Sequence, residues 1–131
     1  MASIFTKIIN REIPGHIIAE DDLAIAFLDI QPLVMGHTLV VPKKEVDYIL
    51  DLEDEDYVHL MKFARKVAGA VEKAIPCIRI GVSVIGLEVP HTHVHLIPLN
   101  KMDDINFSRP KLSPSQEELA AVAESIKKHL D

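Results

Sequence analysis

The sequence predicts an α+β fold, in which an antiparallel sheet carries one long helix and a C-terminal helix. Three observations lead to this prediction. Strand-like segments fill the first fifty residues, a long stretch of helical periodicity follows, and two further strand-like segments precede a capped helix. The 131 residues are the length of one domain. We therefore expect a single domain over 1–131, with residues 1–99 as its core and residues 100–131 as a connector and the C-terminal helix.

The first fifty residues predict a meander of short antiparallel strands bounded by proline and glycine. Residues 16–20 form the first segment. Apolar side chains fill nearly every position of residues 23–30, as in a strand buried on both faces, and Asp29 lies at its end. Residues 37–41 are rich in β-branched side chains and are followed by a proline, which cannot donate to a sheet.

A long amphipathic helix is predicted from Asp54 to the residue before Pro76. Asp51 is the expected N-cap, and the acidic residues 54–56 place negative charge in the first turn, where the helix dipole favours it. Apolar residues recur at spacings of three and four, the period of one helix face. They are Tyr57, Leu60, Met61, Ala64, Val67, Ala68, Val71 and Ile75.

The second half of the chain predicts a hairpin, a connector and a last helix. Residues 77–85 and 91–99 have strand composition and are expected to pair across a short turn. Residues 100–111 form a polar connector. A capping box at residues 113–116, with its proline at the first helical position, predicts the start of the last helix. Its apolar stripe consists of Leu119, Val122, Ile126 and Leu130.

Composition limits the function and the environment. With 14 Lys and Arg against 20 Asp and Glu, the net charge is −6, the wrong sign for holding long nucleic acid. Apolar runs fall far short of the roughly 20 residues that span a bilayer, so we expect no membrane partner. Residues 1–10 lack the features of a secretory signal, and Cys77 has no second cysteine to pair with. We expect a cytoplasmic protein.

Three histidines alternate along the predicted last strand, at positions 91, 93 and 95. Side chains alternate between the two faces of a strand, so His91, His93 and His95 are expected to form a row of imidazoles on one face. Such a row is compatible with a solvated polar strand face. It is also compatible with a metal site for Zn, Cu or Fe, in which His95 or His37 would be a third ligand.

A third interpretation of the histidine row is nucleophilic catalysis at phosphorus. One neutral imidazole would attack, while its neighbours donate hydrogen bonds to the phosphate oxygens and the leaving group. Neighbouring imidazoles titrate as a coupled set, so the row would present a nucleophile and a cationic donor together. This arrangement would let an acidic protein hold one phosphate group locally.

With these residues in view, the sequence resembles the histidine triad (HIT) family of nucleotide hydrolases and transferases along nearly its whole length. The resemblance rests on specific motifs in matching order and spacing. They are SIFTKIINREIP at residues 3–14, AFLDIQP at 26–32, GHTLVVPK at 36–43 and EVPHTHVH at 88–95.

The resemblance assigns a role to each histidine of the site. His93 would be the nucleophile that attacks the α-phosphorus of a nucleotide and forms a covalent nucleotidyl-histidine. His95 would bind a phosphate oxygen, His91 would orient the row, and His37 would support it from behind. The HIT-like activity expected is cleavage of nucleoside 5′-phosphoramidates or related nucleotide and dinucleotide polyphosphates, with transfer to another acceptor as a variant within the enzyme class.

The resemblance also implies a nucleotide-binding pocket and a homodimer. Asp29 would accept hydrogen bonds from the ribose hydroxyls, since a carboxylate offers two acceptors to a diol. Glu88 would offer its backbone N–H to phosphate. The partner would be a purine nucleotide or a derivative, and no cofactor is expected. The side chains lining the base pocket would be Phe5, Ile8, Phe27, Leu28 and Ile30.

The sequence departs from the family pattern at positions that bear on metal binding and on the phosphate loop. Zinc-containing members have Cys where this chain has Ser3 and Thr6 and His where it has Glu45, so no metal site of that type is expected. The segment before the triad runs directly into Leu87, which predicts a shortened phosphate loop. Two non-enzymatic alternatives remain open: a nucleotide-binding regulatory module with negligible turnover, and a metal-binding protein that uses the histidine row.

Overall fold

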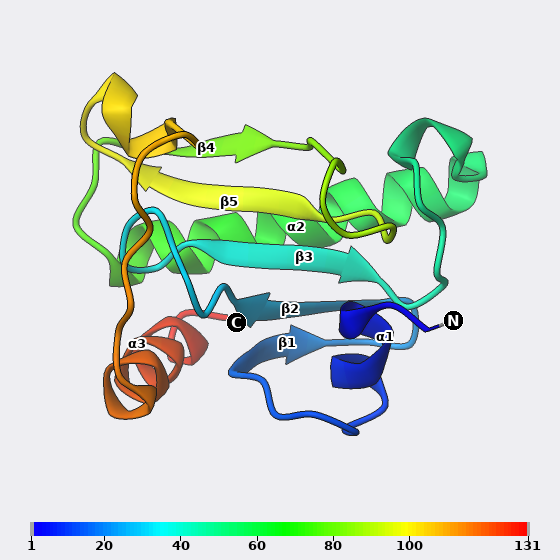
Figure 1. Ribbon diagram of the computed structural model, residues 1–131, viewed down its shortest axis with the longest axis horizontal. Helices are drawn as coiled ribbons and strands as arrows, with labels where there is room; N and C mark the ends of the chain where they lie inside the picture. Colours follow the sequence, from blue (N-terminus) through cyan, green and yellow to red (C-terminus); the bar gives the residue numbers. More distant parts are fainter. Residues whose placement is uncertain (1, 131) are drawn as a thin grey trace.

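The computed structural model describes residues 2–130, and its five strands form one antiparallel sheet (Figure 1). The predicted α+β architecture is confirmed. In chain order the elements are α1 (Ile4–Ile9), β1 (Ile17–Glu20), β2 (Ala24–Leu28), β3 (Thr38–Pro42), the 3-10 turn η1 (Ile49–Asp51), α2 (Asp54–Ala74), β4 (Arg79–Ser83), β5 (Val94–Leu99), the 3-10 turn η2 (Met102–Ile105) and α3 (Gln116–Lys127).

The strand order β1-β2-β3-β5-β4 places β5 inside the sheet, between β3 and the edge strand β4. The predicted pairing of β4 with β5 is present, with Ser83 opposite His95, but residues 84–93 form a longer connection than the expected short turn. On its other side β5 pairs with β3, so that His95 also lies opposite Leu39. This crossover brings the C-terminal histidine of the triad beside the strand that follows His37.

Helices α2 and α3 cover one face of the sheet, where the larger core lies. The apolar stripe of α2 packs on alternate residues of the strands, including Ala24, Ala26 and Leu28 of β2. Leu119 and Ile126 of α3 join the same core. In the described part of the chain, no helix combines the length and apolar character needed to cross a membrane.

The opposite face carries α1, which the sequence did not predict. Residues 1–50 were expected to be extended, and for Ile4–Ile9 that expectation is wrong. A six-residue helix is too short to show a clear period and is unstable alone. Tertiary packing holds it, because Phe5 and Ile8 are buried against Phe27 and its neighbours on β2 and β3.

Helix α2 begins at Asp54 as predicted, but the N-cap residues of α2 and α3 both differ from the predicted ones. Asp51 belongs to η1, and Glu53 is the N-cap residue of α2. The capping box of α3 consists of Ser115 and Glu118, so Pro114 precedes the helix instead of occupying its first turn. The Ser115 hydroxyl accepts from the Glu118 N–H at 3.1 Å, and the Glu118 carboxylate accepts from the Ser115 N–H at 2.9 Å. This pair satisfies two backbone donors at once, which explains the later start.

Candidate active site

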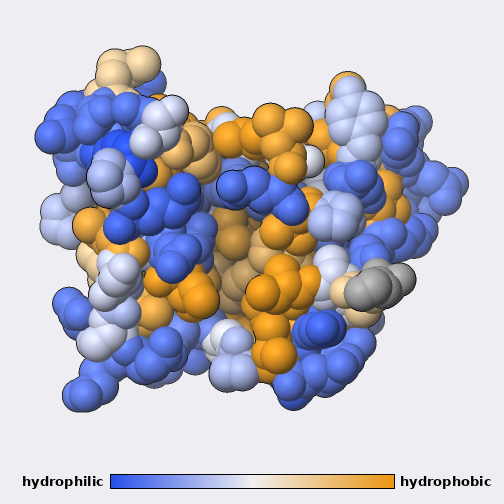
Figure 2. All heavy atoms as spheres, viewed as in Figure 1, coloured by the Kyte–Doolittle hydropathy of each residue, from blue (hydrophilic) through white to orange (hydrophobic). Residues whose placement is uncertain are grey.

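Two adjoining pockets open on the sheet face that carries α1. One has a volume of about 220 Å³ and contains histidine side chains, and the other has about 330 Å³ and is mostly apolar. Figure 2 shows this face, which is hollowed near its middle with hydrophobic side chains in and around the hollow. The residues that line both pockets are Asp29, Glu88, His93, His95 and Lys111.

Every residue that the sequence placed around a base lines the apolar pocket, although the Leu28 side chain packs in the core under α2. The rings of Phe5 and Phe27 lie 5.5 Å apart between centroids. Leu39 and Val89 complete the walls and were not singled out from the sequence. An apolar pocket with aromatic walls suits a planar ring. The predicted residues that line it are Phe5, Ile8, Phe27, Leu28 and Ile30.

Asp29 lies just after β2, where the two pockets meet. One carboxylate oxygen accepts a hydrogen bond from the Gln31 N–H at 2.9 Å, which fixes the side chain. Burial raises the pKa of Asp29, and the negative charge of Glu88 contributes in the same direction. The carboxylate is therefore held at the boundary between the apolar pocket and the histidines, while the Glu88 side chain is exposed at the rim.

His37 and His95 form a buried relay whose proton positions follow from their partners. The Leu33 N–H donates to His37 Nδ1 at 3.1 Å, so that nitrogen carries a lone pair. His37 Nε2 then carries the hydrogen and donates to His95 Nδ1 at 2.9 Å. His95 is left with its own hydrogen on Nε2. His95 therefore offers the pocket a hydrogen-bond donor.

His93 has the opposite tautomer. Its Nδ1 lies 2.7 Å from the backbone oxygen of His91. A carbonyl oxygen can only accept, so Nδ1 carries the hydrogen and Nε2 carries the lone pair of the neutral ring. The rings of His93 and His95 are 5.0 Å apart between centroids. A nucleophilic nitrogen and an N–H donor thus lie side by side.

The predicted row of three imidazoles on one strand face is wrong for His91. Strand β5 begins at Val94, so residues 91–93 precede it and do not follow its alternation. The His91 ring is fully buried and lines neither pocket. Its Nε2 donates to the Pro42 carbonyl at 2.7 Å, and its Nδ1 accepts from the Ser3 hydroxyl, also at 2.7 Å. Both nitrogens are used inside the protein.

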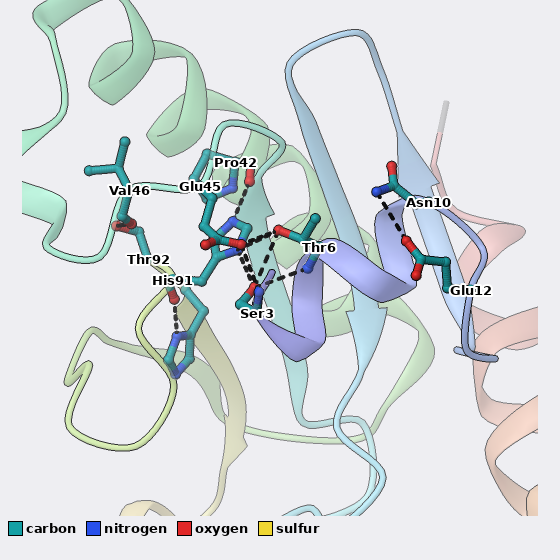
Figure 3. A network of polar contacts seen from close by, with 10 residues as sticks. Ser3, Thr6, Asn10, Glu12, Pro42, Glu45, Val46, His91 and Thr92 are labelled. Carbon is teal, nitrogen blue, oxygen red and sulfur yellow. Dashed lines mark hydrogen bonds and ion pairs between the residues drawn. The ribbon is translucent and has the colours of Figure 1, made fainter. Parts of the chain in front are cut away.

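Ser3, Thr6 and Glu45 form a hydrogen-bond network around His91 (Figure 3). Glu45 accepts from the Ser3 N–H at 2.8 Å and from the Thr6 hydroxyl at 2.5 Å. The bond from the Ser3 N–H, aided by the Thr6 hydroxyl, lowers the pKa of Glu45. Within residues 2–130, no three His, Cys, Asp or Glu side chains gather so that they could hold a metal ion. The network orients His91, whose carbonyl in turn orients His93.

The histidine relay is neutral, which corrects the expectation of a cationic donor in the row. Burial, as the main cause, lowers the pKa of His37 to about 3 and that of His95 to about 4. Burial also lowers the pKa of His91. Near pH 7 these rings act through hydrogen bonds, and the charge that balances a phosphate must come from another group.

Phe107 and Lys111 were also missed from the sequence, and both belong to the segment expected to be a polar connector. The ring of Phe107 lies edge-on to His95, with centroids 4.9 Å apart. Lys111 lines both pockets. The C-terminal helix α3 itself packs on the other face of the sheet. No periodicity or motif marks Phe107 and Lys111, because their place depends on how the connector folds back.

Fold and site define a small antiparallel α+β protein with two opposed histidine tautomers at the centre of its sheet. A family model described as HIT domain matches residues 10–102, and the chain belongs to the HIT, or histidine triad, family.

Two relatives and one solved structure illustrate the similarity. An uncharacterized HIT-like protein of Borreliella burgdorferi is 41% identical over 113 residues, 81% of each chain. The protein of Schizosaccharomyces pombe named adenosine 5′-monophosphoramidase hnt1 is 33% identical over 128 residues, 96% of each chain. The crystal structure of a Hit-like protein from Bartonella henselae, described as involved in cell-cycle regulation, has a TM-score of 0.86 at 35% identity, covering 98% of this chain and 96% of that one.

Proposed function

We propose that the protein is a nucleotide hydrolase that cleaves nucleoside 5′-phosphoramidates, or related nucleotide and dinucleotide polyphosphates, at the α-phosphorus. The observation that carries this proposal is the pair of tautomers, with a lone pair on His93 Nε2 beside the N–H of His95. The name of the Schizosaccharomyces pombe relative supports phosphoramidates as the first substrates to test.

In the proposed reaction, His93 Nε2 attacks the α-phosphorus, and the bond from phosphorus to the leaving amine breaks. The amine takes up a proton from solvent as it leaves, the nucleotidyl group stays on Nε2, and the water that attacks in the second step returns a proton to solvent. The Nδ1–H keeps its bond to the His91 carbonyl, which stabilises the positive charge that develops on the ring. Water then attacks phosphorus and releases the nucleoside monophosphate, which restores His93. One phosphoramidate and one water thus give one monophosphate and one amine.

The two pockets orient the substrate in this proposal. The base occupies the apolar pocket beside Phe5 and Phe27, and the ribose hydroxyls donate to Asp29 where the pockets meet. His95 donates its Nε2–H to a phosphate oxygen. Held in this way, the α-phosphorus lies beside His93, and the positioning itself lowers the barrier.

The proposal is tested by intact mass spectrometry of samples quenched at neutral or alkaline pH after mixing with adenosine 5′-phosphoramidate. Wild type and His93→Ala are compared, with His129→Ala as the control because His129 is exposed on the last turn of the chain. AMP release is followed in parallel by chromatography. We expect an adenylyl adduct and AMP release in wild type and in the control, and neither in His93→Ala.

The same experiment distinguishes the main alternative. If wild type binds AMP but forms no adduct and releases no AMP, the regulatory module with negligible turnover is the better interpretation. Equal AMP release by His93→Ala and wild type would reject His93 as the nucleophile while leaving hydrolysis in place.

We also propose that the protein is a homodimer that uses the edge strand β4 and the neighbouring face of α2. Strand β4 pairs on one side with β5 and ends the sheet. Apolar side chains are exposed along this edge, with Ile78 at 70%, Val82 at 54% and Tyr57 at 40%. An exposed apolar strand edge favours association with another chain. Sedimentation equilibrium of wild type and Val82→Lys tests this, and a monomeric wild type would contradict it.

A further inference from the structure

We propose that Lys111 binds the α-phosphate of the nucleotide and supplies a positive charge that the neutral pair His37 and His95 does not. This inference rests on the proposed function, since it concerns the same nucleotide in the same pockets. It assigns to the connector before α3 a role in ligand binding.

The first observation is the charge of the pocket walls. Within residues 2–130, Lys111 is the only lysine or arginine among the side chains that line the two pockets. Asp29 and Glu88 line both pockets and are acidic. Without Lys111, a phosphate dianion would enter between two carboxylates and face no full positive charge, which is unfavourable.

The second observation is that the hydrogen bonds of the relay exclude an extra proton. His37 Nδ1 accepts from the Leu33 N–H, so protonation there would place two hydrogens between the same atoms. His95 Nδ1 accepts from His37 in the same way at 2.9 Å. Both rings are therefore neutral donors and acceptors. The strong lowering of their pKa values by burial agrees with this geometry.

The third observation is the location of Lys111 where the two pockets join. Together with Asp29 and His95 it forms part of both walls. Burial is the main cause of the raised pKa of Asp29, and the charge of Lys111 opposes it. The same charge adds to the lowering of the pKa of His95. A nucleotide whose ribose contacts Asp29 and whose phosphorus faces His93 has its phosphate oxygens at this junction.

The fourth observation is that the backbone around Lys111 is held in place. The Leu112 N–H donates to the Pro32 carbonyl at 2.9 Å, and the Arg109 guanidinium donates to the Leu33 carbonyl. Arg109 also pairs with Asp103 at 3.0 Å. These bonds attach the connector to the loop before His37, and Figure 1 shows the connector passing one end of the sheet on its way to α3.

The Lys111 side chain itself is exposed, and no ion pair joins it to a carboxylate of the described residues. Its backbone is thus fixed while its ammonium remains available. A lysine can act as a point charge toward phosphate without fixed geometry, so a mobile side chain is sufficient.

The test is calorimetric titration of AMP and adenosine into wild type, Lys111→Gln, Lys111→Arg and Lys66→Gln. Lys66 is exposed on α2, across the sheet from the pockets, and its substitution gives the same change in net charge. We expect Lys111→Gln to weaken AMP binding about tenfold, as one charge-assisted contact of about 1.4 kcal/mol would. Adenosine affinity should stay unchanged, and Lys111→Arg and Lys66→Gln should bind AMP like wild type.

Other outcomes overturn the inference in distinguishable ways. If Lys111→Gln binds AMP as tightly as wild type, Lys111 does not contact the phosphate, and the proposed function stands. If AMP and adenosine weaken in parallel, Lys111 acts on packing or on Asp29, and the phosphate contact is rejected. If wild type binds AMP no better than adenosine, both this inference and the phosphate site of the proposed function fail.

Discussion

Acid should destabilise this protein between pH 7.5 and pH 5, because two buried histidines fold in the neutral form. His37 and His95 are only 1% and 8% exposed. Burial, as the largest cause, lowers the pKa of His37 to about 3 and that of His95 to about 4, from 6.5 in a solvated chain. The unfolded chain therefore takes up protons in this range that the folded chain does not, and stability falls as the pH falls.

The magnitude follows from these pKa values. At pH 5 the solution is about 1.5 pH units below the pKa of an unfolded histidine. Each unit costs about 1.36 kcal/mol of unfolding free energy, so each histidine lowers the stability by about 2 kcal/mol and the two together by about 4 kcal/mol. His91 adds in the same direction, since burial lowers its pKa. Asp29 opposes them, because its pKa is raised by burial and the folded carboxyl regains its proton at a higher pH than the unfolded one. Carboxylates whose pKa is lowered, such as Glu20, lose their contribution to folding stability mainly below pH 5.

The assay is urea unfolding at pH 7.5 and pH 5 for wild type, the double variant His37→Gln with His95→Gln, and the exposed control His129→Gln. Wild type and control should lose the same unfolding free energy, and the double variant should lose about 4 kcal/mol less than wild type. Proton NMR of the histidine rings measures their pKa values directly in the unsubstituted protein. A wild-type loss below about 1 kcal/mol, or a His95 titration midpoint near 6.5, would refute the reasoning.

Three further predictions concern single side chains of the site. Ser3→Ala should lower the unfolding free energy by about 1–3 kcal/mol, because it removes the hydroxyl that donates to the buried Nδ1 of His91. A loss below about 0.5 kcal/mol in urea unfolding would contradict this. Asp29→Asn should weaken the binding of AMP about tenfold or more in calorimetry, while the affinity for 2′,3′-dideoxy-AMP stays unchanged. A parallel loss of affinity for both ligands would argue against a contact between Asp29 and the ribose. Phe107→Ala should raise the pKa of His95 from about 4 by exposing its ring, and an unmoved NMR titration would show that Phe107 does not shield it.

Much of the fold could be predicted from sequence because its elements carry strong local patterns. The apolar stripe of α2 has a clear helical period, and β2 belongs to a short, nearly continuous apolar run. The helix α1 could not be predicted, since its six residues gain stability only when Phe5 and Ile8 pack on the sheet. Local propensity is a weak guide for an element whose stability comes from distant contacts.

Some residues of the candidate site could be predicted from the sequence, and others could not. Asp29 and the base-pocket residues were predicted because they lie in two segments, residues 3–14 and 26–32, that resemble motifs of the HIT family. Lys111 lies about 80 positions from Asp29 in sequence, and the two share a pocket only because the connector bonds to the loop at Pro32 and Leu33. Such a contact leaves no local signal in a polar segment.

The alternation of the triad suggested three equivalent imidazoles, yet their hydrogen-bond partners make them different. His91 is satisfied on both nitrogens by Ser3 and Pro42, so its contribution to the site is its carbonyl oxygen. That oxygen sets the tautomer of His93, while the relay behind His95 sets the opposite tautomer. Burial and their hydrogen bonds keep His37 and His95 neutral, so these two rings provide hydrogen bonds but no charge. In the proposed site, His93 provides the nucleophile and His95 the N–H donor, while Lys111 of the connector provides the positive charge.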